Sequence, residues 1–271
     1  QSKAFDVVHF HNISVYGPGV LEIPAPADAV KLYTAHEHWL VCPLSVLWRN
    51  NRELCQRPTC TTCTLRAGRP PQLWRHTALL ERCAQSVDAF FALTEASAKA
   101  HRERGFTPKM RILPDFVAAP ADLAMPPPHP RPYFLFAGRL EKYKGLQDVI
   151  PLFAGDGRYD LLILGQGGYE RELRQLAQGS PRVHFAGWIG AEQLDPYYQN
   201  SRALIAASLT YETFGMVVAE AMAHDTPVIV RELGAYLELI NASGAGLLFS
   251  NNQGLAECVD KIGTDDLLRA R

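Results

Sequence analysis

Two cations and two carboxylates in the second half of the chain have types and spacings suited to chemistry. Arg139 and Lys144 share one loop, residues 137–145, and two such cations suit the oxygens of a diphosphate. Glu212 and Glu220 form an E-x7-E pattern. A loop carboxylate can accept hydrogen bonds from sugar hydroxyls, and a helix carboxylate can hold both hydroxyls of a ribose. The combination favours a site for a diphosphate that carries sugar groups.

Each feature taken alone has a simpler interpretation. A basic loop is often a solvated surface loop. Glu212 could be a helix-entry carboxylate favoured by the helix dipole, and Glu220 could be an exposed helix residue. The glycine cluster Gly165, Gly167 and Gly168 indicates a tight turn at least as readily as a close approach to a ligand. The functional interpretation therefore depends on where these residues lie in the fold.

Short apolar runs alternate with helical segments after residue 132, which predicts a parallel sheet covered by helices on both faces. The predicted strands are 133–137, 160–164, 183–186, 203–207, 227–230 and 246–249, and the predicted helices are 146–153, 169–177, 192–200, 216–223, 235–240 and 254–261. Ligands of such sheets bind beyond the carboxyl ends of the strands. Arg139, Lys144 and Glu212 all follow strand ends. Gly215 opens a helix whose first N–H groups would form an anion site.

The first half predicts strands at 6–11, 30–35, 89–94 and 110–113, with a helix at 95–104 that Thr94 caps. Five prolines then fall in the seven residues 126–132. Such a run cannot continue a helix or a central strand, so it indicates a stiff linker between two α/β domains. We expect these domains at residues 1–125 and 133–271.

The order of motifs after the linker resembles the C-terminal domain of glycosyltransferase family 4. The motifs are G-R-L-x3-K-G at 138–145, F-A-G-W at 185–188 and S-x3-E-T-F-G-x4-E-A-M-A at 208–223, and the resemblance extends from residue 133 to about residue 260. It implies a GT-B fold of two Rossmann-like domains with parallel sheets. The N-terminal, acceptor-side domain would be incomplete, and the C-terminal domain would bind the donor.

The resemblance also implies an activity: retaining transfer of a hexose-type sugar from a nucleotide-diphosphate sugar to a glycan, lipid or small-molecule acceptor. The residues implied to bind the donor are Arg139, Lys144, Gly187, Trp188, Glu212, Phe214, Gly215, Met216 and Glu220. Arg139 and Lys144 would neutralise the leaving phosphate. Glu212 would contact the transferred sugar, and Glu220 would bind the ribose. The chain has no D-x-D sequence, so we expect no metal cofactor in catalysis.

The first half resembles an acceptor domain of the same family through T-A-H-E-H-W-L-V-C-P at 34–43. The resemblance implies that His36 faces the cleft and can touch the transferred sugar. The implied catalytic set is therefore Glu212, His36, Arg139 and Lys144. A packing or hydrogen-bonding role explains His9, His11 and His38 equally well, so they are not included in this set.

Four of the six cysteines, Cys42, Cys55, Cys60 and Cys63, form a C-x12-C-x4-C-x2-C pattern. Four thiolates suit a tetrahedral zinc ion, and a closing C-x2-C pair is frequent in zinc sites. The pattern favours a structural zinc. Free thiols and a disulfide stay open as alternatives, although a reducing cytosol disfavours stable disulfides.

The net charge and the hydropathy of the chain exclude some classes of binding partner. The net charge of −1 argues against a general nucleic-acid binder. No run approaches the length of a membrane span and no signal peptide pattern is visible, so we expect a cytoplasmic protein. The basic segment 99–111 is typical of a solvated helix face or of a surface that docks on an anionic membrane. The oligomeric state cannot be read from these patterns.

Two other functions fit parts of the sequence. A sugar-nucleotide 2-epimerase shares the fold and would interconvert nucleotide sugars without an acceptor, but the motif at 212–223 argues against it. A non-catalytic module would bind the nucleotide sugar and neither transfer nor hydrolyse it. Donor binding with and without turnover distinguishes these alternatives from a transferase.

Overall fold

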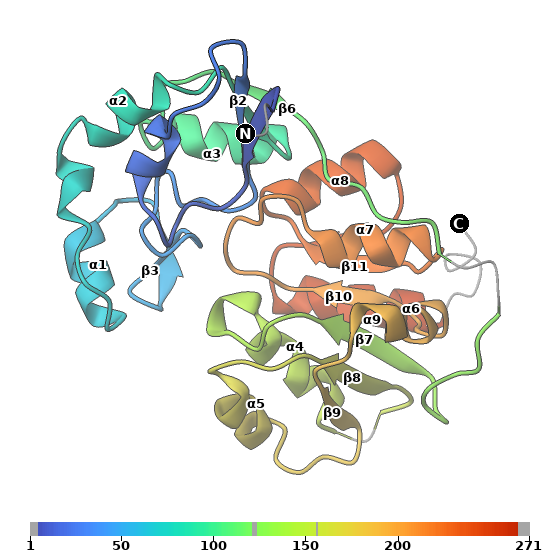
Figure 1. Cartoon of the computed structure of the whole chain (residues 1–271). Helices are drawn as coiled ribbons and strands as arrows, with labels where there is room; N and C mark the ends of the chain where they lie inside the picture. Colours follow the sequence, from blue (N-terminus) through green and yellow to red (C-terminus); the bar gives the residue numbers. More distant parts are fainter. Residues whose placement is uncertain (1–4, 121–123, 156, 265–271) are drawn as a thin grey trace. The chain divides into compact units, whose positions relative to one another are not determined.

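The computed structural model describes residues 5–120, 124–155 and 157–264 (Figure 1). Residues 1–4, 121–123, 156 and 265–271, which include the outer ends of both predicted domains, lie outside this description. The chain divides into two compact units. Unit 1 comprises Gln1–Asp115 with Thr210–Phe214, and unit 2 comprises Phe116–Leu209 with Gly215–Arg271. The proline-rich stretch 126–132 therefore groups with unit 2.

Unit 2 contains a six-stranded sheet in which every neighbouring pair is parallel (Figure 1). Its strands are β7 (Tyr133–Ala137), β8 (Asp160–Leu164), β9 (Val183–Gly187), β10 (Leu204–Ala206), β11 (Val228–Arg231) and β12 (Leu247–Phe249). They lie in the order β12-β11-β10-β7-β8-β9. This is the doubly wound order, in which the direction of winding reverses between β7 and β10. Ligands of such sheets bind at this switch point.

Both faces of the sheet are buried, which explains its continuous apolar strands. Alternate residues of β7 enter opposite cores: Phe134 and Phe136 pack on one face, and Tyr133 and Leu135 on the other. The first core includes residues of α4 (Leu146–Phe153), α5 (Glu170–Leu176) and α9 (Asn252–Thr264). The second includes residues of α6 (Asp195–Gln199), α7 (Met216–Ala223) and α8 (Ala235–Ser243). Two helical layers thus hold the sheet rigid.

Unit 1 contains a four-stranded parallel sheet in the order β1-β2-β5-β6. The strands are β1 (Val7–Phe10), β2 (Val30–Ala35), β5 (Ala89–Ala92) and β6 (Met110–Ile112), and the helices are α1 (Cys60–Arg66), α2 (Leu79–Ala84) and α3 (Glu95–Arg102). Thr94 caps α3 as predicted, because its hydroxyl accepts the Ser97 N–H at 3.1 Å. A two-stranded hairpin, β3 (Trp48–Arg49) with β4 (Glu53–Leu54), completes the unit with two short 3-10 turns, η1 (Pro18–Glu22) and η2 (Leu73–His76).

One predicted helix, 192–200, is divided in the structure. A 3-10 turn, η4 (Ala191–Gln193), precedes α6, and Pro196 lies in the first turn of α6. Proline is favoured there because the first N–H groups of a helix have no intrahelical partner. No helix in the described ranges is both long and apolar enough to cross a lipid bilayer.

Candidate functional site

The loops that leave β7 and β10 meet at the carboxyl edge of the unit 2 sheet. The backbone N–H of Leu209 donates to the carbonyl oxygen of Tyr143 at 2.7 Å. Gly145, at φ 78°, lies so close to Ala207 that an added Cβ would stand 2.0 Å from its carbonyl oxygen. A side chain at residue 145 would push the two loops apart. The switch point is therefore closed by direct backbone contact.

The two predicted phosphate-binding cations lie over one ring. The guanidinium carbon of Arg139 is 5.9 Å and the ammonium nitrogen of Lys144 is 6.0 Å from the ring centroid of Tyr143. Tyr143 is buried in the 3-10 turn η3 (Lys142–Lys144), whereas Arg139 is exposed. A cation held over an aromatic face keeps its N–H groups available to an anion. The loop thus gathers two positive charges beside the switch point.

The first turn of α7 lies after the strand β10. Gly215 is its N-cap at φ 101°, and no side chain caps the helix. An added Cβ at Gly215 would stand 2.6 Å from the ring of Tyr236, so the residue must be glycine for two reasons. Met216 follows and is partly exposed. The free N–H groups of this turn have the geometry of an anion site.

Glu220 lies further along α7 and is oriented by a buried tyrosine. The hydroxyl of Tyr198 donates to Oε2 of Glu220 at 2.6 Å. Burial, and then the neighbouring carboxylate, raise the pKa of Tyr198, so that its hydroxyl remains a donor. Among the described residues no hydrogen-bond partner is recorded for Oε1 of Glu220, which is half-buried. One carboxylate oxygen is fixed and the other can accept a ligand hydroxyl.

Gly187 and Trp188 end β9 on the same edge of the sheet. Gly187, at φ 76°, accepts a backbone hydrogen bond from Gly165 at 2.6 Å. The side chain of Trp188 is 71% exposed. An exposed indole next to a rigid turn offers a flat surface on which an aromatic ligand group can stack.

Two predicted donor-binding residues belong to unit 1. Glu212 and Phe214 lie in Thr210–Phe214, which groups with that unit by its contacts. The Thr213 hydroxyl donates to the carbonyl oxygen of His36 at 2.8 Å. Phe214 is buried and Glu212 is half-buried. The segment that carries Glu212 is thereby tied to the end of β2.

Three histidines form one stack in unit 1, beyond the ends of β1 and β2. A ring nitrogen of His11 lies 2.9 Å from Nε2 of His36, and the rings of His9 and His11 are 4.1 Å apart. Nδ1 of His36 is 3.5 Å from a carboxylate oxygen of Asp115. Burial, and then His11 and His36, lower the pKa of His9. The sequence predicted a functional role for His36 alone, whereas the structure places His11 and Asp115 beside it.

His38 lies apart from this stack. It is buried against His101, with ring centroids 5.0 Å apart. Burial, followed by the charge of His101, lowers its pKa well below the usual value, so it stays neutral.

Arg231, at the end of β11, was not singled out from the sequence. Its guanidinium donates to the carboxylate of Asp148 at 2.7 Å and to the carbonyl oxygen of Ala207 at 3.1 Å. Asp148 lies in the first turn of α4, directly after the Lys144 loop. Arg231 therefore braces that loop against β10. The sequence signal that could have identified this residue is an arginine at the end of an otherwise apolar strand.

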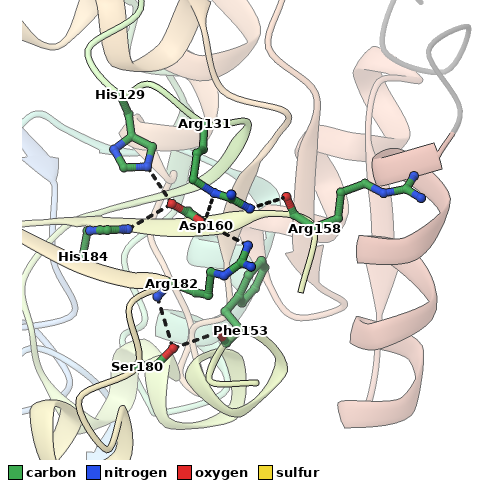
Figure 2. Close-up of polar contacts among 8 residues, drawn as sticks. All are labelled: His129, Arg131, Phe153, Arg158, Asp160, Ser180, Arg182 and His184. Carbon is green, nitrogen blue, oxygen red and sulfur yellow. Dashed lines mark hydrogen bonds and ion pairs between the residues drawn. The ribbon is translucent and has the colours of Figure 1, made fainter. Parts of the chain in front are cut away.

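A second group of charged residues lies at the opposite, amino-terminal edge of the same sheet (Figure 2). Asp160, the first residue of β8, is 1% exposed. One oxygen accepts hydrogen bonds from His129 at 2.7 Å and His184 at 3.0 Å. The other accepts from Arg131 at 3.0 Å and lies 3.6 Å from Arg182. We call these five residues the Asp160 cluster.

The histidine and aspartate ligand atoms of the Asp160 cluster lie within 4.8 Å of one another, a set that could hold a metal ion. The charges argue against this. Arg131 and Arg182 already outnumber the single carboxylate, so a divalent cation would enter a surplus of positive charge. Because His129 and Arg131 come from the proline-rich stretch, the cluster is better explained as the anchor of that stretch to β8 and β9.

The four clustered cysteines all lie in unit 1. Together with Pro43, Trp48, Arg49 and Thr59 they line one small cavity. All of them are free thiols in the structure.

Residues 124–271 match the family model described as Glycosyl transferases group 1. The uncharacterized glycosyltransferase MJ1607 of Methanocaldococcus jannaschii is 31% identical over 139 residues, which cover 48% of this chain and 35% of that protein. The GDP-mannose-dependent alpha-mannosyltransferase of Corynebacterium glutamicum is 34% identical over 113 residues, covering 42% of this chain and 26% of that protein. The matched stretches thus span little more than a third of these relatives at most.

Solved structures share the fold. Sucrose-phosphate synthase (tll1590) from Thermosynechococcus elongatus has a TM-score of 0.71 at 22% identity, over 98% of this chain and 66% of that chain. Anabaena Alr3699/HepE in complex with UDP-glucose has a TM-score of 0.69 at 19% identity, over 98% of this chain and 71% of that chain. The expectation of an α/β fold of the GT-B type with parallel sheets is confirmed.

Proposed function

The chain belongs to the family of group 1 glycosyl transferases, and from this premise we propose that it binds a nucleotide-diphosphate sugar in unit 2 and transfers the sugar to an acceptor hydroxyl. The sugar is of the hexose type, and the acceptor is a glycan, a lipid or a small molecule. The motifs at 138–145 and 208–223 further support membership of the retaining family 4.

The observation that carries this proposal is the chemistry gathered at the switch point of the unit 2 sheet. Arg139 and Lys144 lie over one ring beside the junction of the β7 and β10 loops. The uncapped first turn of α7 follows β10, and Glu220 lies on that helix with one carboxylate oxygen fixed by Tyr198. Cations for a diphosphate and a carboxylate for a ribose thus share one edge.

Each part of the donor then has a partner. Arg139, Lys144 and the N–H groups that begin at Gly215 and Met216 bind the diphosphate. Glu220 accepts hydrogen bonds from the ribose hydroxyls. The indole of Trp188, after Gly187, stacks on the nucleobase. Glu212 and Phe214 contact the transferred sugar. The names of relatives support two donor classes to test first, GDP-mannose and UDP-glucose.

The reaction needs positive charge where the leaving group departs. The bond between C1 of the sugar and the diphosphate oxygen breaks, and its electron pair leaves with the nucleoside diphosphate. Arg139, Lys144 and the α7 amides stabilise that charge without rearranging. The acceptor oxygen then bonds to C1 on the face the phosphate left, and its proton passes to the departing phosphate. Glu212 is not assigned the role of a covalent nucleophile.

His36 is proposed to act on the transferred sugar from unit 1. Its Nε2 lies next to His11 and its Nδ1 next to Asp115, so the orientation of the ring is held at both nitrogens. Because both nitrogens have a neighbour, a sugar hydroxyl that bonds to His36 would replace His11 at Nε2 or Asp115 at Nδ1. Replacing His36 by Ala should lower the transfer rate more than the donor affinity.

The direct test is calorimetric binding of UDP-, GDP-, ADP-, dTDP- and CDP-sugars, followed by Lys144→Ala with the best donor. Loss of one charge-assisted hydrogen bond should weaken binding about 10- to 100-fold. Lys142→Ala is the matched control, because it removes the same charge from the same loop and should leave affinity unchanged. No binding of any donor to the wild type, or equal effects of the two variants, would refute the assignment.

Turnover separates the alternatives. A transferase releases nucleoside diphosphate faster when a suitable acceptor is added, and NMR of the product shows the retained anomer. A 2-epimerase interconverts the nucleotide sugar with no acceptor present. A non-catalytic module binds the donor and leaves it intact in every mixture.

A further inference from the structure

The hairpin β3–β4 and helix α1 of unit 1 bring four thiols to one place. Cys42 precedes the hairpin, Cys55 follows it directly, and Cys60 and Cys63 lie on α1. The space that they line is about 10 Å³, enough for one small sphere. Four cysteines that line one small space can supply the donor set of a tetrahedral site.

The four thiols come together from three separate parts of unit 1, because the loop before the hairpin, the residue after it and α1 all contribute to the lining of one cavity. A metal ion bound there takes thiolates as ligands and releases their protons.

The backbone between Cys42 and Cys55 is held in an uncommon conformation. In the described part of the chain, six residues other than glycine have positive φ, and four of them fall in this short stretch: Ser45, Leu47, Asn50 and Asn51. The asparagines form the hairpin turn, where such angles are favoured. Leu47, at φ 50°, has no such preference. Strain of this kind persists only where other bonds fix the segment.

Few apolar contacts are available to fix it. The hairpin strands have two residues each and α1 has seven. The buried cluster at this place consists of Cys42, Leu47 and Ala100, with four partly buried residues packed against it: Val41, Leu44, Cys55 and Tyr211. Small elements with so little core are commonly held by a metal ion or by disulfides.

One hydrogen bond already points to a sulfur ligand. The backbone N–H of Asn50, in the hairpin turn, donates to Sγ of Cys63 at 3.3 Å. Amide groups that donate to a ligating atom orient it and stabilise its charge. Two arginines lie nearby as well: Arg75 interacts electrostatically with Cys42 and Cys60, and Arg104 with Cys55. Their two charges would offset the double negative charge of a zinc ion with four thiolates.

We propose that Cys42, Cys55, Cys60 and Cys63 bind one Zn²⁺ ion, which fixes the β3–β4 hairpin and α1 as a structural unit. The sulfur atoms do not share the 4.8 Å mutual spacing found in the Asp160 cluster. Zn–S bonds of about 2.3 Å require sulfur atoms about 3.8 Å apart, so the proposal requires the cysteine side chains to rotate toward the cavity when the ion binds. The small space disfavours an iron–sulfur cluster, the other common occupant of four thiolates.

The test is the metal content of the full chain, purified with reductant and without chelator. Mass spectrometry of the native protein should find one zinc per chain and no disulfide. Cys60→Ser and Cys63→Ser should each lower bound zinc at least tenfold. Cys83→Ser and Cys258→Ser are matched controls, because these buried cysteines lie outside the site, and they should keep full zinc content.

A second measurement does not depend on variants that fold. Wild-type chain exchanged into Co²⁺ should develop the thiolate-to-cobalt absorption of a tetrahedral four-sulfur site, and a strong chelator should abolish that absorption and lower the melting temperature. A zinc-free chain with four reactive thiols, or a chain with a disulfide among these cysteines, would overturn the proposal. Neither readout uses a nucleotide sugar, so a failed zinc site and a failed donor site are told apart.

Discussion

The two edges of the unit 2 sheet carry similar charges with opposite consequences. At the carboxyl edge Arg139 and Lys144 lie over the Tyr143 ring, beside the junction of the β7 and β10 loops. At the amino edge Arg131 and Arg182 face the carboxylate of Asp160. The first pair is proposed to bind the diphosphate of a ligand, whereas the second pair forms ion pairs within the fold.

The difference lies in the buried carboxylate and not in the number of cations. Asp160 neutralises its neighbours and ties the proline-rich stretch to the sheet. The carboxyl edge also has an internal ion pair, Arg231 with Asp148, but that pair braces the loop and leaves Arg139 to other partners. Cations that already surround a buried carboxylate of the chain, as at Asp160, are therefore no evidence of an anion site.

The largest expected effect is at the amino edge. Asp160→Asn leaves Arg131, Arg182 and two histidines around a neutral amide. Breaking a buried ion pair in this way costs about 3 kcal/mol of unfolding free energy, the low end of the usual range, because Arg131 is partly exposed and can turn to water. Urea denaturation measures the loss. Asp225→Asn, at an exposed aspartate, is the control and should be neutral.

The second prediction compares the loss of one arginine at each edge of the sheet. Arg139→Ala should weaken donor binding about 10- to 100-fold and leave stability within about 0.5 kcal/mol, since the side chain is exposed. Arg131→Ala should do the reverse, lowering stability by about 1 kcal/mol without changing donor affinity. Calorimetry and urea denaturation on both variants check this. Equal effects of the two variants on binding would mean that the edges do not differ as proposed.

The sequence predicted the carboxyl edge better than the amino edge, for a physical reason. Strands buried on both faces, such as β7 and β8, are continuous apolar runs, and the residues after them fall at one edge whatever the details of packing. Arg139 could therefore be picked out in advance. Asp160 is bonded to residues 24 to 31 positions away, and no local pattern indicates which cations will meet it.

In unit 1 an even smaller part of the structure could be predicted from local sequence patterns. Its four parallel strands were predicted, but the β3–β4 hairpin and α1 were not, because they are too short for a periodic pattern and depend on contacts at their ends. The stack of His9, His11 and His36 joins the ends of β1 and β2 across 25 positions of sequence. The register between neighbouring parallel strands decides which of their residues are in contact, and this register cannot be predicted from the sequence alone.

The third prediction concerns pH at the amino edge. Burial by itself would raise the pKa of Asp160, but hydrogen bonds from His129, His184 and Arg131 outweigh it and hold the pKa below its usual value of 3.8. The stabilisation is then present above the unfolded value and is lost as pH falls through the folded one. In urea denaturation at pH 5 to 3, the wild type should lose up to about 1.4 kcal/mol per pH unit more than Asp160→Asn. Parallel pH profiles of the two proteins would contradict this.

The smallest effect is expected at the carboxyl edge, for a variant that tests how the carboxylate of Glu220 is oriented. Tyr198→Phe removes the hydroxyl that donates to Oε2 at 2.6 Å. Loss of about 1 kcal/mol should weaken donor binding about fivefold. Tyr197→Phe, on the neighbouring residue of α6, is the control and should leave binding unchanged.

A donor with 2′-deoxyribose makes this last test specific. If Glu220 binds the ribose hydroxyls, the wild type should prefer the ribose donor over the deoxy donor, and Tyr198→Phe should reduce that preference because the carboxylate is free to turn. Calorimetry of both donors with both proteins gives the coupling free energy between the Tyr198 hydroxyl and the 2′-hydroxyl of the donor ribose. A preference that Tyr198→Phe leaves intact would mean that Glu220 stabilises the helix and not the ligand. The carboxyl edge would then hold its donor by the cations alone.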